Sequence, residues 1–288
     1  MAKQKKVKLQ EYQYVNSLIN NAVMDYRVYV MNPMEKIIVS IALIIIGGLV
    51  GLVFYGGLFK SDGEATLATY ISNLIFFMIV GLYARKMFLP IYKNSRLKKR
   101  QDKLRKQFRN MMESLSASLS SGSNVLNAFN SALIDLKMQY TESDYIIIEL
   151  QEIIDCMGSN VNAEEAMHFF GERSGIEDIQ TFADVFEICY RRGGDMKRIV
   201  RRTYDVISDK MAINDEIETK LTSNKMQHNA MSVMPIAVVA LLRVTNASFA
   251  ESFATVQGVL VNTVAIVIFV SALSLIHISE PTRHAQIS

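Results

Sequence analysis

The long uncharged stretch between Lys36 and Lys60 constrains the fold of this chain more than any other feature. Within it, Ile37 to Leu58 is almost entirely apolar and would extend about 33 Å as an α-helix, enough to cross a hydrocarbon core of about 30 Å. A cleaved signal peptide is the alternative, but the run is longer than a typical signal core and no small-residue cleavage site follows it. We therefore expect a transmembrane helix here.

Three further segments could also cross a membrane. Ala65 to Ala84 is uncharged and follows the first segment after a short turn, so the two are expected to form a hairpin. Ser252 to Ile276 is long enough for another span. Met226 to Leu242 is marginal in length and contains Pro235, so a buried helix of a soluble domain is an alternative for it. The sequence thus predicts an all-α integral membrane protein with about four transmembrane helices.

Basic residues are concentrated on one side of these predicted spans. The run from Arg85 to Arg109 is rich in Lys and Arg and contains a single acidic residue. By contrast, Lys60 and Arg243 are the only basic residues in the two predicted outer loops. Because basic loops stay in the cytoplasm, we expect a multi-pass protein of the cytoplasmic membrane with both termini cytoplasmic. A basic run beside a span is typical of contact with anionic lipid, and nucleic-acid binding is disfavoured because no aromatic stacking platform accompanies it. Arg243 is expected to reach the membrane interface.

The chain is expected to comprise five segments. They are a cytoplasmic basic and amphipathic segment (residues 1–36), a transmembrane hairpin (37–84), a cytoplasmic helical domain (85–225), two C-terminal transmembrane helices (226–276) and a tail (277–288). The last residues, Ser274 to Ser288, read SLIHISEPTRHAQIS and look like translated adapter sequence. We therefore expect a non-native tail that starts at 277, or already at 274.

The cytoplasmic domain is predicted to be a bundle of about six helices, since apolar residues recur three and four positions apart from Tyr92 to Lys225. Asn162 and Glu165 resemble a capping box. The last helix begins near Met196, and no clear helix breaker separates it from the predicted span at Met226 to Leu242. Expected helix ends are Gly122, Gly158, Gly175 and Gly193 with Gly194, and expected starts follow Ser123, Thr141, Asn162 and Asp195.

Two parts of this domain resemble each other weakly. Gly122 precedes NVLNAF and Gly194 precedes DMKRIV, so a glycine turn comes before a short amphipathic helix in both. The preceding helices carry corresponding bulky residues, namely Phe108, Met112 and Leu115 in the first and Phe182, Val185 and Phe186 in the second. Duplicated helical units and ordinary bundle periodicity both explain the pattern.

No catalytic constellation, cofactor motif or metal motif is evident in the sequence. The four histidines lie in different segments without a second ligand at metal spacing. Glu149, Glu152 and Asp155 share one helix face; a salt-bridged or solvated face is favoured, and a hard cation is the alternative. Cys156 and Cys189 are expected to be small reduced thiols. We therefore expect no enzyme activity, no cofactor and no metal.

A basic cluster around a double-glycine turn is the one polar motif that suggests a binding site. The sequence RRGGDMKRIVRR could dock an acidic partner, because its arginines can form bidentate contacts with carboxylates and its glycines permit close backbone approach. A solvated helix face and contact with the membrane surface are the alternatives. The candidate partner-binding residues are Arg191, Arg192, Gly193, Gly194, Lys197, Arg198, Arg201 and Arg202.

Two stretches and the predicted topology carry a resemblance to a known family. They are FRNMMESLSASLSSGSNVLNA (Phe108 to Ala128) and FADVFEICYRRGGDMKRIV (Phe182 to Val200). Together with the run from Asp25 to Lys36, they make the chain similar to the type II secretion system F family, most closely its TadB-like branch from tight-adherence (Tad) pilus assembly. The resemblance covers roughly Tyr26 to Ala272. Met112 stands where the family often has Leu.

The resemblance implies a non-enzymatic platform protein in the cytoplasmic membrane. Such a protein links a cytosolic secretion ATPase to pilin subunits drawn from the bilayer, and works as a homo- or hetero-oligomer, with a related platform subunit among its expected partners. A membrane sensor that relays a signal to a cytosolic bundle is the alternative, disfavoured because the predicted outer loops around Phe59 to Glu64 and Val244 to Gln257 are small.

Overall fold

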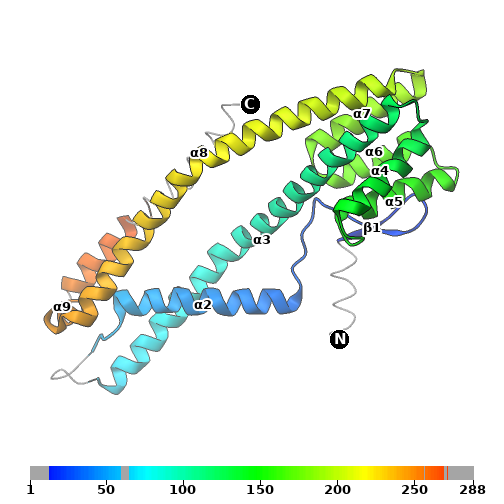
Figure 1. Cartoon of the computed structure of the whole chain (residues 1–288). Coiled ribbons are helices and arrows are strands. Elements are labelled where there is room, and N and C mark those ends of the chain that lie inside the picture. Colours follow the sequence, from blue (N-terminus) through cyan, green and yellow to red (C-terminus); the bar gives the residue numbers. More distant parts are fainter. Residues whose placement is uncertain (1–12, 60–64, 256, 269–270, 272–288) are drawn as a thin grey trace. The chain divides into compact units, whose positions relative to one another are not determined.

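The computed structural model describes residues 13–59, 65–255, 257–268 and 271, which are almost entirely helical (Figure 1). The predicted all-α class is therefore confirmed; the tail expected at 277–288, or from 274, lies outside the described residues. In chain order the elements are β1 (Tyr14–Asn16), β2 (Ala22–Met24), α2 (Pro33–Tyr55), α3 (Leu67–Ser120), α4 (Val125–Gln139), α5 (Tyr145–Gly158), α6 (Ala163–Ser174), α7 (Glu177–Arg192), α8 (Met196–Thr245) and α9 (Ala247–Ser252).

The chain divides into two compact units. One, which we call the polar unit, comprises Met1–Pro33 and Ile91–Glu218, and the other, the apolar unit, comprises Met34–Pro90 and Thr219–Ser288. Helices α3 and α8 each contribute residues to both units, so each is a continuous helical connection between them. The prediction that the helix beginning near Met196 continues without a break is confirmed, since α8 is helical as far as Thr245 with Pro235 inside it.

The described residues of the polar unit form six helices, in agreement with the expected number of about six, namely the end of α3, helices α4 to α7 and the beginning of α8. Its core holds five phenylalanines that are at most 1% exposed. The rings of Phe108 and Phe182 meet edge to face with centroids 5.7 Å apart. Helices α6 and α7 pack closely because Gly171 lacks a side chain, and a Cβ there would lie 2.8 Å from that of Ala183.

The predicted helix boundaries are largely confirmed. Gly122, Gly175 and Gly193 have left-handed backbones, with φ of 92°, 62° and 68°, which glycine adopts without steric cost. Asn124, not Ser123, caps α4, because its Oδ1 accepts a hydrogen bond from the Asn127 amide at 2.8 Å. Asn162 occupies the cap position of α6 but makes no side-chain cap bond, so the predicted capping box is not formed.

Residues 13–32, which we call the N-terminal strap, belong to the polar unit and carry the antiparallel β1–β2 hairpin. Tyr26 of the strap is 1% exposed, and its hydroxyl donates to Oε1 of Glu149 in α5 at 3.0 Å. The Tyr26 amide donates to the carbonyl of Arg173 in α6 at 2.9 Å. The segment before the first apolar helix is thus partly built into the core of the helical bundle.

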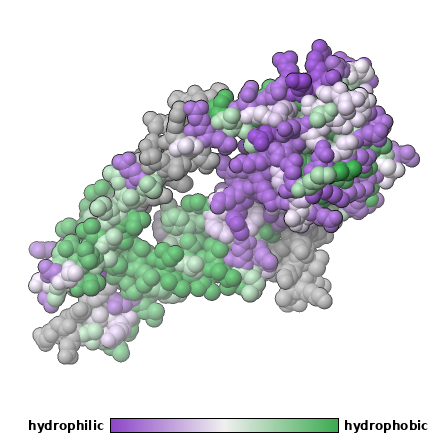
Figure 2. Space-filling model, viewed as in Figure 1, coloured by the Kyte–Doolittle hydropathy of each residue, from purple (hydrophilic) through white to green (hydrophobic). Residues whose placement is uncertain are grey.

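The apolar unit contains the two helices that are long and apolar enough to cross a membrane among the described residues, α2 and the first part of α3. Ala230–Thr245 and Gln257–Ile268 are shorter apolar helices. Helices α2 and α3 pack closely at a glycine of the first apolar run, because a Cβ on Gly47 would lie 2.5 Å from that of Ala84 in α3. Hydrophobic surface covers much of this unit, whereas the surface of the polar unit is mainly hydrophilic (Figure 2). Two helices could therefore span a membrane.

Arg243 has a more specific environment than the interface position expected for it. Its guanidinium donates two hydrogen bonds to the last turn of α2, to the carbonyls of Leu52 (3.0 Å) and Val53 (2.7 Å), and a third to the carbonyl of Gly56 (2.8 Å), which directly follows the helix. Asn262 also donates to the carbonyl of Phe54 at 2.9 Å. Because the final carbonyls of a helix lack partners within it, Arg243 and Asn262 act as a C-terminal cap for α2.

Candidate functional site

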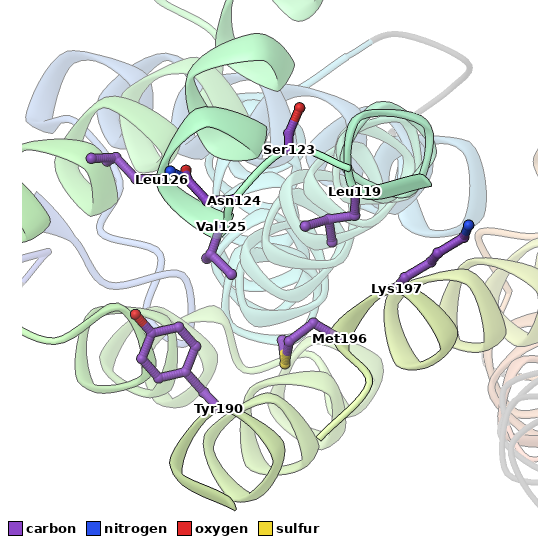
Figure 3. A pocket seen from close by; sticks show the side chains of 8 residues that line it. All are labelled: Leu119, Ser123, Asn124, Val125, Leu126, Tyr190, Met196 and Lys197. Carbon is purple, nitrogen blue, oxygen red and sulfur yellow. The ribbon is translucent and has the colours of Figure 1, made fainter. Parts of the chain in front are cut away.

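The α3–α4 turn at Gly122 and the α7–α8 turn at Gly193 lie side by side and border an open hollow (Figure 3). We call it the turn hollow; its volume is about 570 Å³. One side comes from the α3–α4 turn and the other from the end of α7 and the beginning of α8. The lining residues are Leu119, Ser123, Asn124, Val125, Leu126, Tyr190, Met196 and Lys197.

The hollow has an apolar floor and a mixed rim. Leu119, Val125 and Met196 are half-buried and pack against the core below. Tyr190 stands at the rim, where its ring stacks on Phe186 with centroids 5.8 Å apart, and the view in Figure 3 shows it opposite Val125. An apolar floor with polar groups at its edge suits a side chain that is apolar itself but belongs to a polar segment.

Two helices begin at the hollow, which favours negative charge there. Asn124 caps α4, and Asp195 caps α8 through a 3.1 Å bond from the Arg198 amide to its Oδ1. Each helix N-terminus carries partial positive charge from its free amides. The end of α3 contributes partial negative charge, but Nζ of Lys197 lies 3.5 Å from the Ser120 carbonyl and offsets it.

The basic cluster predicted from the sequence lies beside and at the edge of this hollow. All eight predicted residues are exposed, and Lys197 lines the hollow directly. Gly193 is the left-handed C-cap of α7, and the Gly194 amide donates to the Cys189 carbonyl at 2.8 Å. Arg191 is engaged within the protein, since its guanidinium lies 3.1 Å from Glu187 and 3.6 Å from the buried Glu164.

The remaining five cations have no carboxylate partner within the described part of the chain. They are Arg192, Lys197, Arg198, Arg201 and Arg202. Lys197 and Arg201 are four residues apart on α8, as are Arg198 and Arg202, so like charges face each other along one helix. Each such pair destabilises a helix by about 0.2–0.5 kcal/mol. The like-charge pairs do not stabilise α8, and the five cations are free to contact a partner outside the bundle.

Sequence reasoning found the cations but missed the hollow. The weak internal similarity pointed to it, because the two similar turns are the ones that meet there. Of the bulky positions compared, Val185 departs from the pattern: it is 37% exposed, whereas the other five, Phe108, Met112, Leu115, Phe182 and Phe186, are buried. Tyr190 and Met196 lie within the stretches quoted from the sequence, but nothing in the sequence shows that their side chains line a hollow.

The acidic face of α5 is occupied by partners within the protein. Glu149 is paired with Arg173 at 2.6 Å, Glu152 accepts a hydrogen bond from Asn21 at 2.9 Å, and Asp155 accepts one from Gln151 at 3.0 Å. Only Glu149 is in an ion pair; Glu152 and Asp155 are hydrogen-bonded by neutral amides, so the face is only partly of the favoured salt-bridged kind. In the residues that the structure describes, no group of three or more His, Cys, Asp or Glu could hold a metal ion.

Comparison of the chain with protein-family models, with curated proteins and with solved structures finds no match. The structure itself defines the class of the protein: its described residues form an all-α protein with a polar helical bundle and two helices able to span a membrane.

Proposed function

We propose that this chain is a membrane platform protein of a Tad-type pilus assembly or type II secretion machine. In this role it couples a cytosolic secretion ATPase to the extraction and assembly of pilin subunits and has no enzymatic activity of its own. One observation carries the proposal: the turn hollow is built from the end of α3 and the beginning of α8, the two helices that also enter the apolar unit. A partner bound there would contact both connections at once.

The proposed topology has four spans in the cytoplasmic membrane. The bonds from Arg243 and Asn262 to the end of α2 support it, because they join both shorter apolar helices to a helix long enough to span. The basic run from Arg85 to Arg109 favours a cytoplasmic location for the polar unit, and with it both termini. Anionic lipid headgroups would then meet this run.

The proposed mechanism transmits ATPase motion along the two shared helices. An ATPase that moves the turns of the polar unit would displace the end of α3 and the start of α8, and these helices would carry the displacement into the spans. A pilin held beside the spans would be moved or released. A second copy or a related platform subunit would complete the assembly.

Affinity purification of the full chain in nanodiscs tests this function. We expect the secretion ATPase and pilins of the source cell to co-purify, with ATP changing the amount of ATPase retained. Reversal of Arg191, Arg192, Arg198 and Arg201 to Glu should abolish retention of the ATPase. Recovery of a signalling protein, with ATPase and pilins expressed but never retained or cross-linked, would favour the sensor and contradict the platform.

A further inference from the structure

We infer that the turn hollow binds an acidic segment of a partner protein, which inserts an apolar side chain between Val125 and Met196 and places carboxylates against Lys197 and Arg201. This inference names the contact surface of the proposed platform function, and rests on it in taking the secretion ATPase as the partner. The occupant is defined by three features of the hollow: its charge, its floor and its concave shape.

Charge selects an acidic occupant. Lys197 and Arg201 lie four residues apart on one face of α8, and neither has a carboxylate partner among the described residues. The capped starts of α4 and α8 add partial positive charge at the hollow itself. Of the two nearest carboxylates in the sequence, Asp195 already caps α8, and Asp205, one helical turn after Arg201, forms no ion pair with it in the described structure. Carboxylates from another chain would complete the pairing.

The apolar floor selects an anchor side chain. Val125 and Met196 are half-buried and face the hollow from opposite turns (Figure 3). Exposed Leu126 and Tyr190, with 44% and 41% exposure, extend this apolar surface to the rim. A volume of about 570 Å³ lies in the range of small-molecule sites and is ample for one or two side chains. Met196 can adapt to the shape of the anchor because methionine is flexible.

A protein segment fits this surface better than a lipid surface does. A bilayer presents a broad layer of headgroups, which would contact the exposed arginines but leave the concave floor unfilled. The hollow combines a floor with a rim of Ser123, Asn124 and Tyr190, which offers hydrogen bonds at defined positions. Such a combination of anchor and directional polar contacts is characteristic of peptide recognition.

Site-specific photo-crosslinking tests the inference in the full chain. The protein would be reconstituted in nanodiscs of neutral phosphatidylcholine, with the purified secretion ATPase of the source cell as the probe. A photoreactive residue would replace Ser123, Leu126 or Tyr190 at the hollow. In control variants it would replace Lys137 or Gln151, which are exposed elsewhere on the bundle. We expect ATPase adducts at least tenfold more abundant from the three hollow positions.

Charge reversal provides the second measurement. Lys197→Glu with Arg201→Glu should weaken ATPase binding at least tenfold, whereas Lys106→Glu with Lys137→Glu, which changes net charge equally at exposed sites, should change it less than twofold. Ser123→Trp, which fills the hollow without changing charge, should also weaken binding. Hydrogen exchange over α4 and α7 establishes that each variant is folded.

The outcomes separate this inference from the platform function. Adducts from Lys137 or Gln151 but none from the hollow would overturn the inference and leave the platform intact. If no position forms an ATPase adduct and the ATPase is not retained in affinity purification, both the inference and the platform function are wrong. If the double reversal leaves ATPase binding unchanged but abolishes binding to phosphatidylglycerol vesicles, the cations serve a membrane surface and the inference is wrong.

Discussion

The Nη2 atom of Arg173 lies 2.6 Å from Oε2 of Glu149, and the two side chains are only 3% and 1% exposed. Arg173 also donates to the Met24 carbonyl of the N-terminal strap at 2.7 Å, while Tyr26 donates to the same carboxylate. Burial raises the pKa of Glu149, and the guanidinium of Arg173 opposes that rise. This buried pair therefore holds α5, α6 and the strap together.

Removing one partner of this pair should cost far more stability than removing both. Arg173→Met leaves a buried carboxylate without its cation, and we expect a loss of about 3–5 kcal/mol in the opening free energy of α5 and α6. Glu149→Leu combined with Arg173→Met should recover most of that loss. Native-state hydrogen exchange over residues 145–174 measures both values. Equal losses in the single and double variants would show that the ion pair itself stabilises the bundle.

The second prediction concerns the stability of the α7–α8 turn, where Gly193 has a left-handed backbone. A Cβ there meets nothing within 4 Å, so Gly193→Ala should destabilise the α7–α8 turn only through its φ of 68°, by about 1 kcal/mol. Gly193→Asn should be tolerated better, since Asn adopts this region more readily. Gly158→Ala is the matched control, because a Cβ there also meets nothing and its position is helical. Hydrogen exchange at residues 189–198 measures the Gly193 variants, and exchange around residue 158 measures the control. Equal changes for Gly193→Ala and Gly193→Asn, or a loss at Gly158→Ala as large as at Gly193→Ala, would refute the conformational explanation.

The features predicted from sequence are those that depend on neighbours along the chain. Glycine stops such as Gly175 and the long helix from Met196 follow from local backbone preferences, and so does the apolar run from Ile37. The pairing of Tyr26 with Glu149 joins residues 123 positions apart, and no periodicity encodes it. The turn hollow likewise forms only where two turns distant in the sequence meet. Its cations could therefore be predicted from the sequence, but its apolar floor could not.

Asp144 predicts a pH dependence at the start of α5. Nζ of Lys103 lies 2.6 Å from its Oδ1, and with bonds from Thr141 and Gln107 this lowers the pKa of Asp144 to about 2. Because the folded pKa lies below the unfolded value of about 3.9, the ionised carboxylate stabilises the fold above about pH 4. That stabilisation is lost as the pH falls towards about 2.

Hydrogen exchange at residues 141–150 between pH 5 and pH 2, corrected for intrinsic exchange, should therefore show a falling opening free energy. Asp144→Asn should lower that energy at pH 5 and remove most of its pH dependence. Glu142→Gln, which removes a nearby exposed carboxylate not bonded to any described residue, should leave the profile unchanged. A wild-type profile that is flat over this range would contradict the assignment.

Arg243 makes the last prediction, which concerns the apolar unit. Its three hydrogen bonds satisfy carbonyls at the end of α2 that have few alternatives among apolar side chains. Arg243→Met should remove this donor from the Val53 and Gly56 carbonyls, whereas the Leu52 carbonyl keeps its bond from the Gly56 amide at 2.8 Å. We expect the unit to be destabilised by about 2–3 kcal/mol, with a lower thermal midpoint in detergent and faster exchange near Gly56. Arg243→Lys should retain part of the stability, because an ammonium can reach fewer of the carbonyls at once. Lys36→Met removes the same charge from an exposed position near the start of α2 and should have little effect. An equal shift for Arg243→Met and Lys36→Met would mean that loss of charge, rather than loss of the helix cap, governs stability.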